Sequence, residues 1–586
     1  MKREKLSKAL DEIDDRHLKE AMDYRPSAGL TAEKFVKFAS IAACFAACVL
    51  IAINIFGHTP NSQTPDNGTT SNDQAYSPPN SQLPDSDPPG SSSGTNICPP
   101  SPFFPSYEYP LPNSLDFSGS TIKFLVCDGD DISNSFSLNS RSILPNPEIV
   151  FYEIDSALFA RNKEVEKALN VRIEMDTCYA RETITKISDC LAADIHLYDV
   201  IGAYQYYDMG LTIGSNGGFF VNFENEELQN DIYIDITKPY WDKELYDLLT
   251  LNGIAYWVTG DITLTHTGSV FVSYVNKNLW EQYADVIAGC RQAKGYSDPY
   301  ELIEKGYWTI DLWQEISKKM WIDRNDNEIA DPDDVTGFLT YGPGLENIMA
   351  DALAAGAGVT YATLSEGEWK IDFETKRNML FATILAALYS PESAACLISF
   401  PNHDEHVMEY FAKGNSLMTV NTFSAAEKYL SHMEDEYYIL PLPKLVPGTS
   451  ERHTTSTHDN LTLFGIPKTA VAENKLAAIT ATLELMAYQS KREVDPLYRQ
   501  AAIGVDSRTE FARQERMLED IFHSVKYDFG VIYGPLILDE QARNGSVTHF
   551  FRTDCQKEQF IYALKNKQSI WQQGLRDLFE DGCFCY

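Results

Sequence analysis

The sequence predicts an α/β fold with a mainly parallel sheet, organised as two lobes that follow a membrane anchor. Segments typical of strands alternate with segments typical of helices from about residue 120 to residue 205, a pattern that indicates βαβ units. At 586 residues, the chain is also longer than one hydrophobic core usually organises. An uncharged apolar stretch and a Pro- and Ser-rich stretch precede this region.

The first predicted strand is STIKFLVCDG, which begins at Ser120. An amphipathic helix over 151–169, the strand VRIEMDT, a helix over 187–193 and the strand LYDVIGA follow. Ligands of such sheets bind at the carboxyl ends of the strands, so the loops after Val126 and Val200 are candidates for a binding site. Further helices are predicted over 379–388, 425–433 and 470–487.

Residues 38–56 form a run of 19 residues without a charge, which is long enough to cross a bilayer as a helix. Lys34 and Lys37 precede this run, and positive charge on that flank places residues 1–37 in the cytoplasm and the rest of the chain outside. We therefore predict a single-pass protein of the cell membrane whose main domain is extracellular. The alternative is a lipoprotein signal that uses Cys48, which leaves the domain on the same side.

Residues 57–117 are rich in Pro, Ser, Asn, Gly and Asp and contain almost no aliphatic side chains. A segment of this composition cannot bury a core, so it is predicted to be a disordered linker between the membrane and a folded region over 118–586.

Charge and cysteine content exclude several classes of function. The net charge is −36, and residues 1–37 hold nine Lys and Arg against eight Asp and Glu, so the negative charge belongs to the rest of the chain. Such a domain repels polyanions, and no nucleic-acid partner is expected. The 11 cysteines are irregularly spaced, without a CxxC pair, which argues against a disulfide framework or a zinc site.

Several stretches carry a resemblance to a known family, in a shared order and spacing. They are EVEKALNVRIE from Glu164, YDVIGA from Tyr198, NGIAYWVTGD, FVSYVNKNLWEQY, KGYWTIDLWQEISKKM, FAKGNSLMTV, YYILPLPK and IPKTAVAENKLAAITATLELMA. In this order they resemble the extracellular solute-binding proteins of family 1, the sugar-binding proteins of ABC transporters with a periplasmic-binding-protein-like type II fold. The resemblance runs through most of residues 118–540.

The resemblance implies two α/β lobes that close on a solute and hand it to an importer. It places lobe 1 at about 118–270 and 460–530, and lobe 2 at about 271–459 and 531–586. The implied partners are a sugar or oligosaccharide and an ABC-transporter permease, and the implied activity is binding without catalysis. The uncleaved anchor and its cytoplasmic head leave a second interpretation open, in which the domain is a sensor that signals occupancy through the membrane helix.

Rings and polar groups near the expected hinge are the candidate ligand-binding residues. A sugar needs flat rings that stack on its C–H faces, together with carboxylates and amides that bond its hydroxyls. The candidates are Tyr204, Tyr206, Tyr207, Trp257, Asp261, Tyr274, Asn276, Phe423 and Asp459. For each aromatic residue, packing in the core is the alternative interpretation.

The segment DRNDNEIADPDD over 323–334 has oxygen-bearing residues at the spacing of a calcium-binding EF-hand loop. The candidate ligands are Asp323, Asn325, Asn327, Ile329 (through its carbonyl), Asp331 and Asp334. Glu328 stands where such a loop prefers Gly, and Asp334 has a shorter arm than the usual Glu, so an acidic turn without a metal is the alternative. No other cofactor is expected.

No catalytic motif accompanies these features: the chain has no GxSxG, no HExxH and no glycine loop for phosphate. With 84 acidic residues, chance pairs of carboxylates are unavoidable, so a surface carbohydrate-active enzyme is retained only as the third interpretation.

Overall fold

The computed structural model describes residues 108–128, 138–145, 153–179, 182–193, 195–205, 219–328, 331, 333–342, 348–389, 396–398, 403–534, 547–548, 550–554 and 560–580. All of them belong to one compact unit, Ile97–Tyr586, which is separate from Met1–Asn96. The predicted cytoplasmic head, the membrane helix over 38–56 and most of the linker lie outside the described residues. Within the described ranges, no helix combines the length and hydropathy that spanning a bilayer requires.

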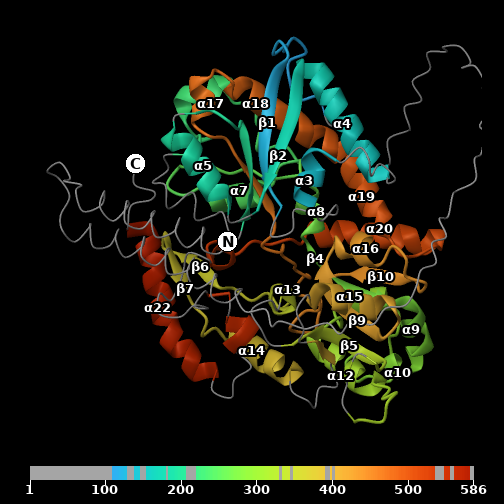
Figure 1. Cartoon of the computed structure of the whole chain (residues 1–586). Helices are drawn as coiled ribbons and strands as arrows, with labels where there is room; N and C mark the ends of the chain where they lie inside the picture. Colours follow the sequence, from blue (N-terminus) through green and yellow to red (C-terminus); the bar gives the residue numbers. More distant parts are fainter. Residues whose placement is uncertain are drawn as a thin grey trace, which may run out of the picture. The chain divides into compact units, whose positions relative to one another are not determined.

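The first lobe is built on a four-stranded sheet in the order β11-β3-β1-β2 (Figure 1). Strand β1 (Ser120–Cys127) pairs in parallel with β2 (Val171–Cys178) and with β3 (Val200–Tyr204). Strand β11 (Thr462–Gly465) runs antiparallel to β3, because the chain returns from the second lobe to reach it. The parallel part of this sheet agrees with the predicted βαβ units.

Two long helices pack together beside this sheet: α4 (Glu153–Leu169) contacts β2, and α18 (Leu476–Gln489) contacts α4 and β1. Strand β1 is buried on both faces, since Phe124 packs in one hydrophobic cluster and Leu125 in the other. The remaining helical segments of this lobe are α3 (Leu138–Ile143), α5 (Thr183–Ala192), the 3-10 turn η3 (Glu226–Asp231), α7 (Lys243–Leu249) and α17 (Thr469–Ala472).

Three of the described segments lie side by side where the lobes meet. The first passes through α8 (Leu264–Gly268), the second covers residues 455–461, and the third includes Val525. Val270 forms a bridge with Thr457, and Thr455 forms one with Val525. We call these three segments the crossing.

Gly268 lies at a close contact between elements at the crossing. A Cβ atom at this position would lie 2.7 Å from the Tyr498 hydroxyl oxygen and 2.8 Å from the Cδ1 atom of Leu138. Any side chain would therefore push apart the elements that meet here.

Between α18 and the third crossing segment, the chain forms a π-helical turn η5 (Ser490–Val494), α19 (Asp495–Ala501) and α20 (Arg508–Phe522). Helix α20 packs on the second lobe: the Gln514 amide oxygen accepts from the Ile439 N–H at 3.0 Å, and its NH₂ donates to the Ile439 carbonyl. These contacts place α20 on the second lobe, although the sequence analysis assigned residues 460–530, which include α20, to lobe 1. An amphipathic pattern shows that one face of a helix is buried but not which lobe buries it.

The second lobe holds a five-stranded mixed sheet in the order β10-β4-β9-β5-β8. Strand β4 (Phe271–Asn276) runs antiparallel to β10 (Tyr437–Leu440) and to β9 (Ser416–Thr422). Strand β5 (Thr336–Tyr341) runs parallel to β9 and to β8 (Cys396–Ile398). The α/β prediction therefore holds for both lobes.

Helices pack around this sheet, and a separate hairpin lies beside α22 (Figure 1). The hairpin pairs β6 (Ala362–Ser365) with β7 (Glu368–Ile371), and α22 (Phe560–Glu580) packs against β7. The other helical segments are α9 (Lys277–Gln282), α10 (Ala284–Ala288), α11 (Pro299–Glu304), α12 (Ile310–Met320), α13 (Ile348–Gly356), α14 (Lys376–Leu388), α15 (His403–Ala412), α16 (Ala425–Tyr429), α21 (Phe529–Ile532) and the π-helical turn η7 (Phe550–Asp554).

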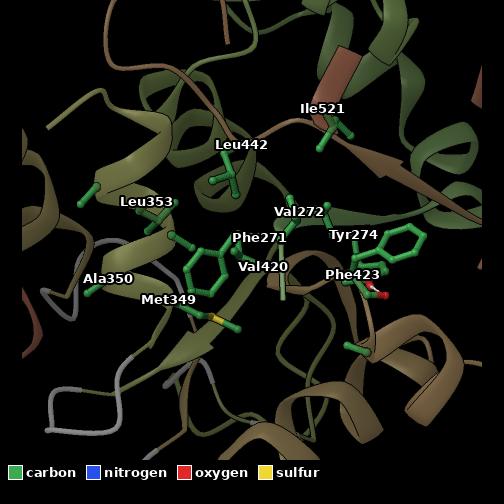
Figure 2. Close-up of a cluster of buried hydrophobic side chains, with 14 of the residues drawn as sticks. Phe271, Val272, Tyr274, Met349, Ala350, Leu353, Val420, Phe423, Leu442 and Ile521 are labelled. Atoms are coloured by element: carbon green, nitrogen blue, oxygen red, sulfur yellow. Dashed lines mark hydrogen bonds between the residues drawn. The ribbon is translucent and has the colours of Figure 1, made fainter. Parts of the chain in front are cut away.

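The core of the second lobe forms where β4 and β9 meet α13. Figure 2 shows Val272 and Tyr274 of β4 with Val420 of β9 and with Met349 and Leu353 of α13. All five side chains are buried. This packing holds the N-terminal half of α13 beside the crossing, where the cavity described next is found.

Candidate functional site

A cavity of about 390 Å³ lies beside the crossing, on the side of the second lobe. Its walls come from the second and third crossing segments, from α13 and from the β6–β7 hairpin. The lining includes Phe271, Asp351, Thr360, Tyr361, Trp369, Thr454, Thr457, His458, Asp459, Lys526, Tyr527, Asp528, Phe529, Thr548 and Arg552. A volume of this size falls in the range of pockets that hold small molecules.

An aromatic wall lines one side of the cavity. The ring of Trp369, on β7, stacks on the ring of Phe529 with centroids 4.2 Å apart and planes at 21°. Phe529 stacks in turn on Tyr533, with centroids 4.3 Å apart. The turn before Trp369 is tight, with positive φ angles at Glu366 (56°) and Gly367 (83°). Flat rings held in this way suit stacking on the C–H face of a ligand.

Charged side chains lie elsewhere in the lining and are bonded to one another. The Arg552 guanidinium donates to the Asp351 carboxylate, with Nε 2.8 Å from Oδ2, and its Nη2 lies 3.4 Å from Asp459 Oδ2. The Nδ1 atom of His458 lies 3.0 Å from Asp459 Oδ1. One guanidinium thus orients two carboxylates, and these three side chains are largely buried.

The two carboxylates differ in acidity because their neighbours differ. Burial raises the pKa of Asp351 and outweighs the lowering effect of Arg552. Burial also opposes ionisation of Asp459, but the charges of His458 and Arg552 hold the pKa of that carboxyl well below its usual range. Among the described residues, Asp351 Oδ1 is buried and has no hydrogen-bond partner.

Asp528 is a third carboxylate in the lining, and its oxygens accept hydrogen bonds from backbone N–H groups. Its Oδ1 accepts from the Gly530 N–H at 2.7 Å and its Oδ2 from the Tyr361 N–H at 2.9 Å. Burial raises the pKa of Asp528 to about 6 despite these bonds. Its oxygens fasten the start of α21 to the start of the β6–β7 hairpin, which holds the aromatic wall in place.

Of the sequence-predicted ligand residues that the structure describes, only Asp459 lines this cavity. Tyr204 ends β3, where it pairs with Thr462 of β11 and is half-buried. Tyr206 and Tyr207 lie outside the described residues. The carboxyl end of β3 was a predicted edge of the site, so Tyr206 and Tyr207 stay candidates.

Two of the predicted residues belong to the first lobe and do not line the cavity. Trp257 is buried and packs on Phe220, with centroids 4.7 Å apart. Asp261 is buried in a charged network, with Oδ1 3.0 Å from His266 Nδ1 and Oδ2 3.1 Å from Lys491 Nζ. In this structure, packing and ion pairing account for both side chains.

Three more predicted residues are buried inside the second lobe. The Tyr274 hydroxyl donates to the Thr422 carbonyl at 2.8 Å. Asn276 caps α9, since its Oδ1 accepts from the Leu279 N–H at 2.9 Å. The ring of Phe423 packs edge-on against Tyr498 and Phe522. Strand β4 is buried along its whole length, and Tyr274 lies in the core of the lobe, as the alternative interpretation held.

Sequence reasoning missed Asp351, Trp369 and Arg552. Asp351 is the one charged residue in the helix sequence IMADALAAG. Because burying a charge is costly, a lone carboxylate in an apolar helix indicates a partner or a ligand, and this pattern could have identified Asp351 from the sequence. Trp369 and Arg552 carried no such signal. They join the site only because the hairpin and the C-terminal region fold back on α13.

The acidic loop over 323–334 is held by hydrogen bonds among its own residues. Asp331 Oδ2 accepts from Asn325 Nδ2 at 2.9 Å and from Asn327 Nδ2 at 2.6 Å. Asp334 Oδ1 accepts from the Arg324 N–H at 2.9 Å. Ile329 lies outside the described residues, and no group of three His, Cys, Asp or Glu with metal-ligand geometry occurs among the residues described. Calcium binding by this loop stays a prediction.

The sequence matches no family model and no curated protein. Solved structures with a similar fold include a cyclic α-maltosyl-1,6-maltose-binding protein from Arthrobacter globiformis (11% identity, TM-score 0.49, covering 79% of this chain and 100% of that one). A second is an ABC substrate-binding protein from Listeria monocytogenes in complex with cycloalternan (13%, TM-score 0.43, 79% and 99%). A third is an ABC-transporter solute-binding protein from Thermotoga lettingae bound to α-D-tagatose (12%, TM-score 0.47, 78% and 100%).

All three are binding proteins. The second and third are named as proteins of ABC transporters. Because the identities are 11–13% and the TM-scores are below 0.5, these similarities assign no ligand to this chain.

Proposed function

We propose that this chain is an extracellular solute-binding protein that captures a carbohydrate for an ABC-type importer. One observation carries the proposal: a cavity beside the crossing combines a stacked aromatic wall with carboxylates that one arginine orients. Sugars present flat C–H faces and rings of hydroxyl groups, and these two kinds of wall complement those two features.

The charges of the lining favour a neutral solute. Arg552 is bonded to both Asp351 and Asp459, so it does not offer an anion an uncompensated positive charge. Thr454 and the crossing residue Thr457 add hydroxyl groups to the lining. A neutral polyol donates to these oxygens and needs no counter-charge.

Capture in this design needs no bond to be made or broken. A solute that contacts the crossing and the second lobe stabilises the arrangement of the lobes that it fits best. Residues 38–56 anchor the chain as a membrane helix, residues 1–37 lie in the cytoplasm, and residues 57–117 give the binding domain its reach. The partner that takes over the solute is an ABC-transporter permease.

Binding to the purified full-length chain tests this proposal directly. We expect maltotriose or another oligosaccharide from a panel to raise the thermal unfolding midpoint saturably, because a ligand of the native state stabilises it by mass action. Trp369→Ala should weaken binding of the same sugar at least about ten-fold, since it removes one ring of the aromatic wall. Isothermal calorimetry measures both proteins.

The matched control is Phe159→Ala, which truncates an aromatic side chain on α4 that is 42% exposed and does not line the cavity. Its affinity should equal that of the wild type. A panel of mono- and oligosaccharides that leaves the midpoint unchanged would sink carbohydrate capture. Equal loss of affinity in both variants would show that the effect of Trp369 is not local.

A further inference from the structure

Four consecutive residues, Lys526–Phe529, contact both lobes and line the cavity. We call this segment the tether. It follows Val525, which bridges to Thr455, and the Lys526 N–H donates to the Thr455 carbonyl at 2.8 Å. The tether thus continues the third crossing segment along the wall of the cavity.

The first two residues of the tether bind the first lobe. The Tyr527 hydroxyl donates to Asp242, which also caps α7 by accepting from the Leu245 N–H at 2.9 Å. Lys526 Nζ lies 2.8 Å from Glu244 Oε2. Both partners of that ion pair are more than half exposed, so it adds little. The bond from Tyr527 to Asp242 is the principal attachment, because it is partly buried and its acceptor is charged.

The last two residues of the tether bind the second lobe. Asp528 accepts from the backbone N–H groups of Tyr361 and Ala362, at 2.9 and 3.2 Å. Phe529 stacks on Trp369 of the β6–β7 hairpin. Within one short stretch, the direction of the contacts therefore changes from the first lobe to the second.

Tyr527 also lines a second cavity, of about 490 Å³, on the side of the first lobe. Its walls include Asp242, His266, Lys491 and Arg499. One tyrosine side chain thus borders both cavities, and its hydroxyl is bonded in the network around Asp242 and His266. A shift of this side chain changes the solute cavity and the contact between the lobes together.

We infer that the Tyr527–Asp242 contact sets the separation of the lobes and, through it, the affinity for solute. Only the claim about affinity rests on the proposed function; the claim about the separation of the lobes does not. A contact that forms in one arrangement of the lobes and is lost in another shifts the equilibrium toward the first arrangement. A solute that fits this arrangement then binds more tightly, because more of the protein is already in the form that it fits. Removing the contact should open the lobes and weaken binding.

The test compares Tyr527→Phe with Tyr246→Phe in the full-length chain. Both changes delete one tyrosine hydroxyl that donates to a carboxylate. Tyr246 donates to Glu224 at 2.5 Å, and both of these residues lie in the first lobe. A dye pair attached through azide-bearing residues at positions 163 and 413, which are exposed on α4 and just after α15, reports the separation of the lobes by energy transfer.

Without sugar, Tyr527→Phe should increase the mean dye separation, and Tyr246→Phe should not. With maltotriose as the probe, Tyr527→Phe should bind roughly ten-fold more weakly, the effect expected for one hydrogen bond to a charged group. Tyr246→Phe should stay within about two-fold of the wild type.

An unchanged dye separation in Tyr527→Phe without sugar overturns the inference. So does a normal affinity for maltotriose in that variant when the wild type binds this sugar. If no protein binds maltotriose or any other sugar, the proposed function fails, and the separation measured without sugar still decides whether the tether holds the lobes.

Discussion

The guanidinium of Arg141 on α3 lies 2.9 Å from the carboxylate of Glu427 on α16, so the two lobes share an ion pair. Their side chains are only 6% and 14% exposed. Arg141 is bonded at the same time to Asp155 of the first lobe, at 2.7 Å. The lobes are thus joined on the α3 side by Arg141 and on the α7 side by Tyr527.

Replacing Glu427 with Gln should destabilise the protein by about 1–2 kcal/mol. The loss stays moderate because Arg141 keeps Asp155 as a partner. Urea unfolding followed by circular dichroism measures it, and a double-mutant cycle with Arg141→Gln isolates the pair. A coupling energy near zero would contradict a stabilising contact between the lobes.

His266 should make stability depend on alkaline pH. Burial disfavours its charged form, but hydrogen bonds from the ring to Asp242 and Asp261 raise the pKa of His266 to about 10. A folded-state pKa above the unfolded value of about 6.5 gives stability that is complete below pH 6.5 and is lost as the pH rises toward 10. We expect a loss of roughly 2–4 kcal/mol over that interval.

The measurement is the unfolding free energy at several values between pH 6 and pH 10. His266→Gln should flatten the dependence. His523→Gln should leave it unchanged, because the His523 side chain is 79% exposed. A wild-type profile that is flat or rises over this interval would refute the assignment.

Glu484 on α18 is the shared acceptor of a buried hydrogen-bond network in the first lobe. It is fully buried and accepts from the Tyr240 hydroxyl, from Trp241 Nε1 at 2.7 Å and from the Asp235 N–H at 3.2 Å. Glu484→Leu leaves three donors without an acceptor and should cost at least about 3 kcal/mol. Glu484→Gln keeps one oxygen and should cost less. Equal losses of stability in the two variants, measured by urea unfolding, would show that the loss of hydrogen bonds to Glu484 does not cause the destabilisation.

Calcium should stabilise the second lobe if the loop over 323–334 binds it as predicted. We expect millimolar calcium chloride to raise the thermal midpoint of the wild type, by the mass action of a ligand on the native state. Asp331→Ala removes one predicted ligand and should abolish the rise. Magnesium chloride at the same concentration controls for ionic strength. A wild-type midpoint that calcium leaves unchanged would contradict the prediction.

Local pattern was enough to predict the classes of secondary structure. The strands at Ser120–Cys127 and Val171–Cys178 and the helix at Glu153–Leu169 were recognisable because periodicity is a property of neighbouring residues. The helix predicted over 425–433 ends at Tyr429 in the structure, since boundaries depend on capping contacts that a pattern does not contain.

The sequence by itself determined the alternation of strands and helices in the first lobe, the acidic character and the apolar run over 38–56. The tertiary structure decided which side chains share a cavity. Asp351 and Arg552 are 201 positions apart, and Trp369 of the β6–β7 hairpin stacks on Phe529 of α21. Whether an aromatic residue such as Tyr274 lines a site or fills a core depends on what packs against its strand. Such contacts form between distant segments, so no local sequence pattern records them.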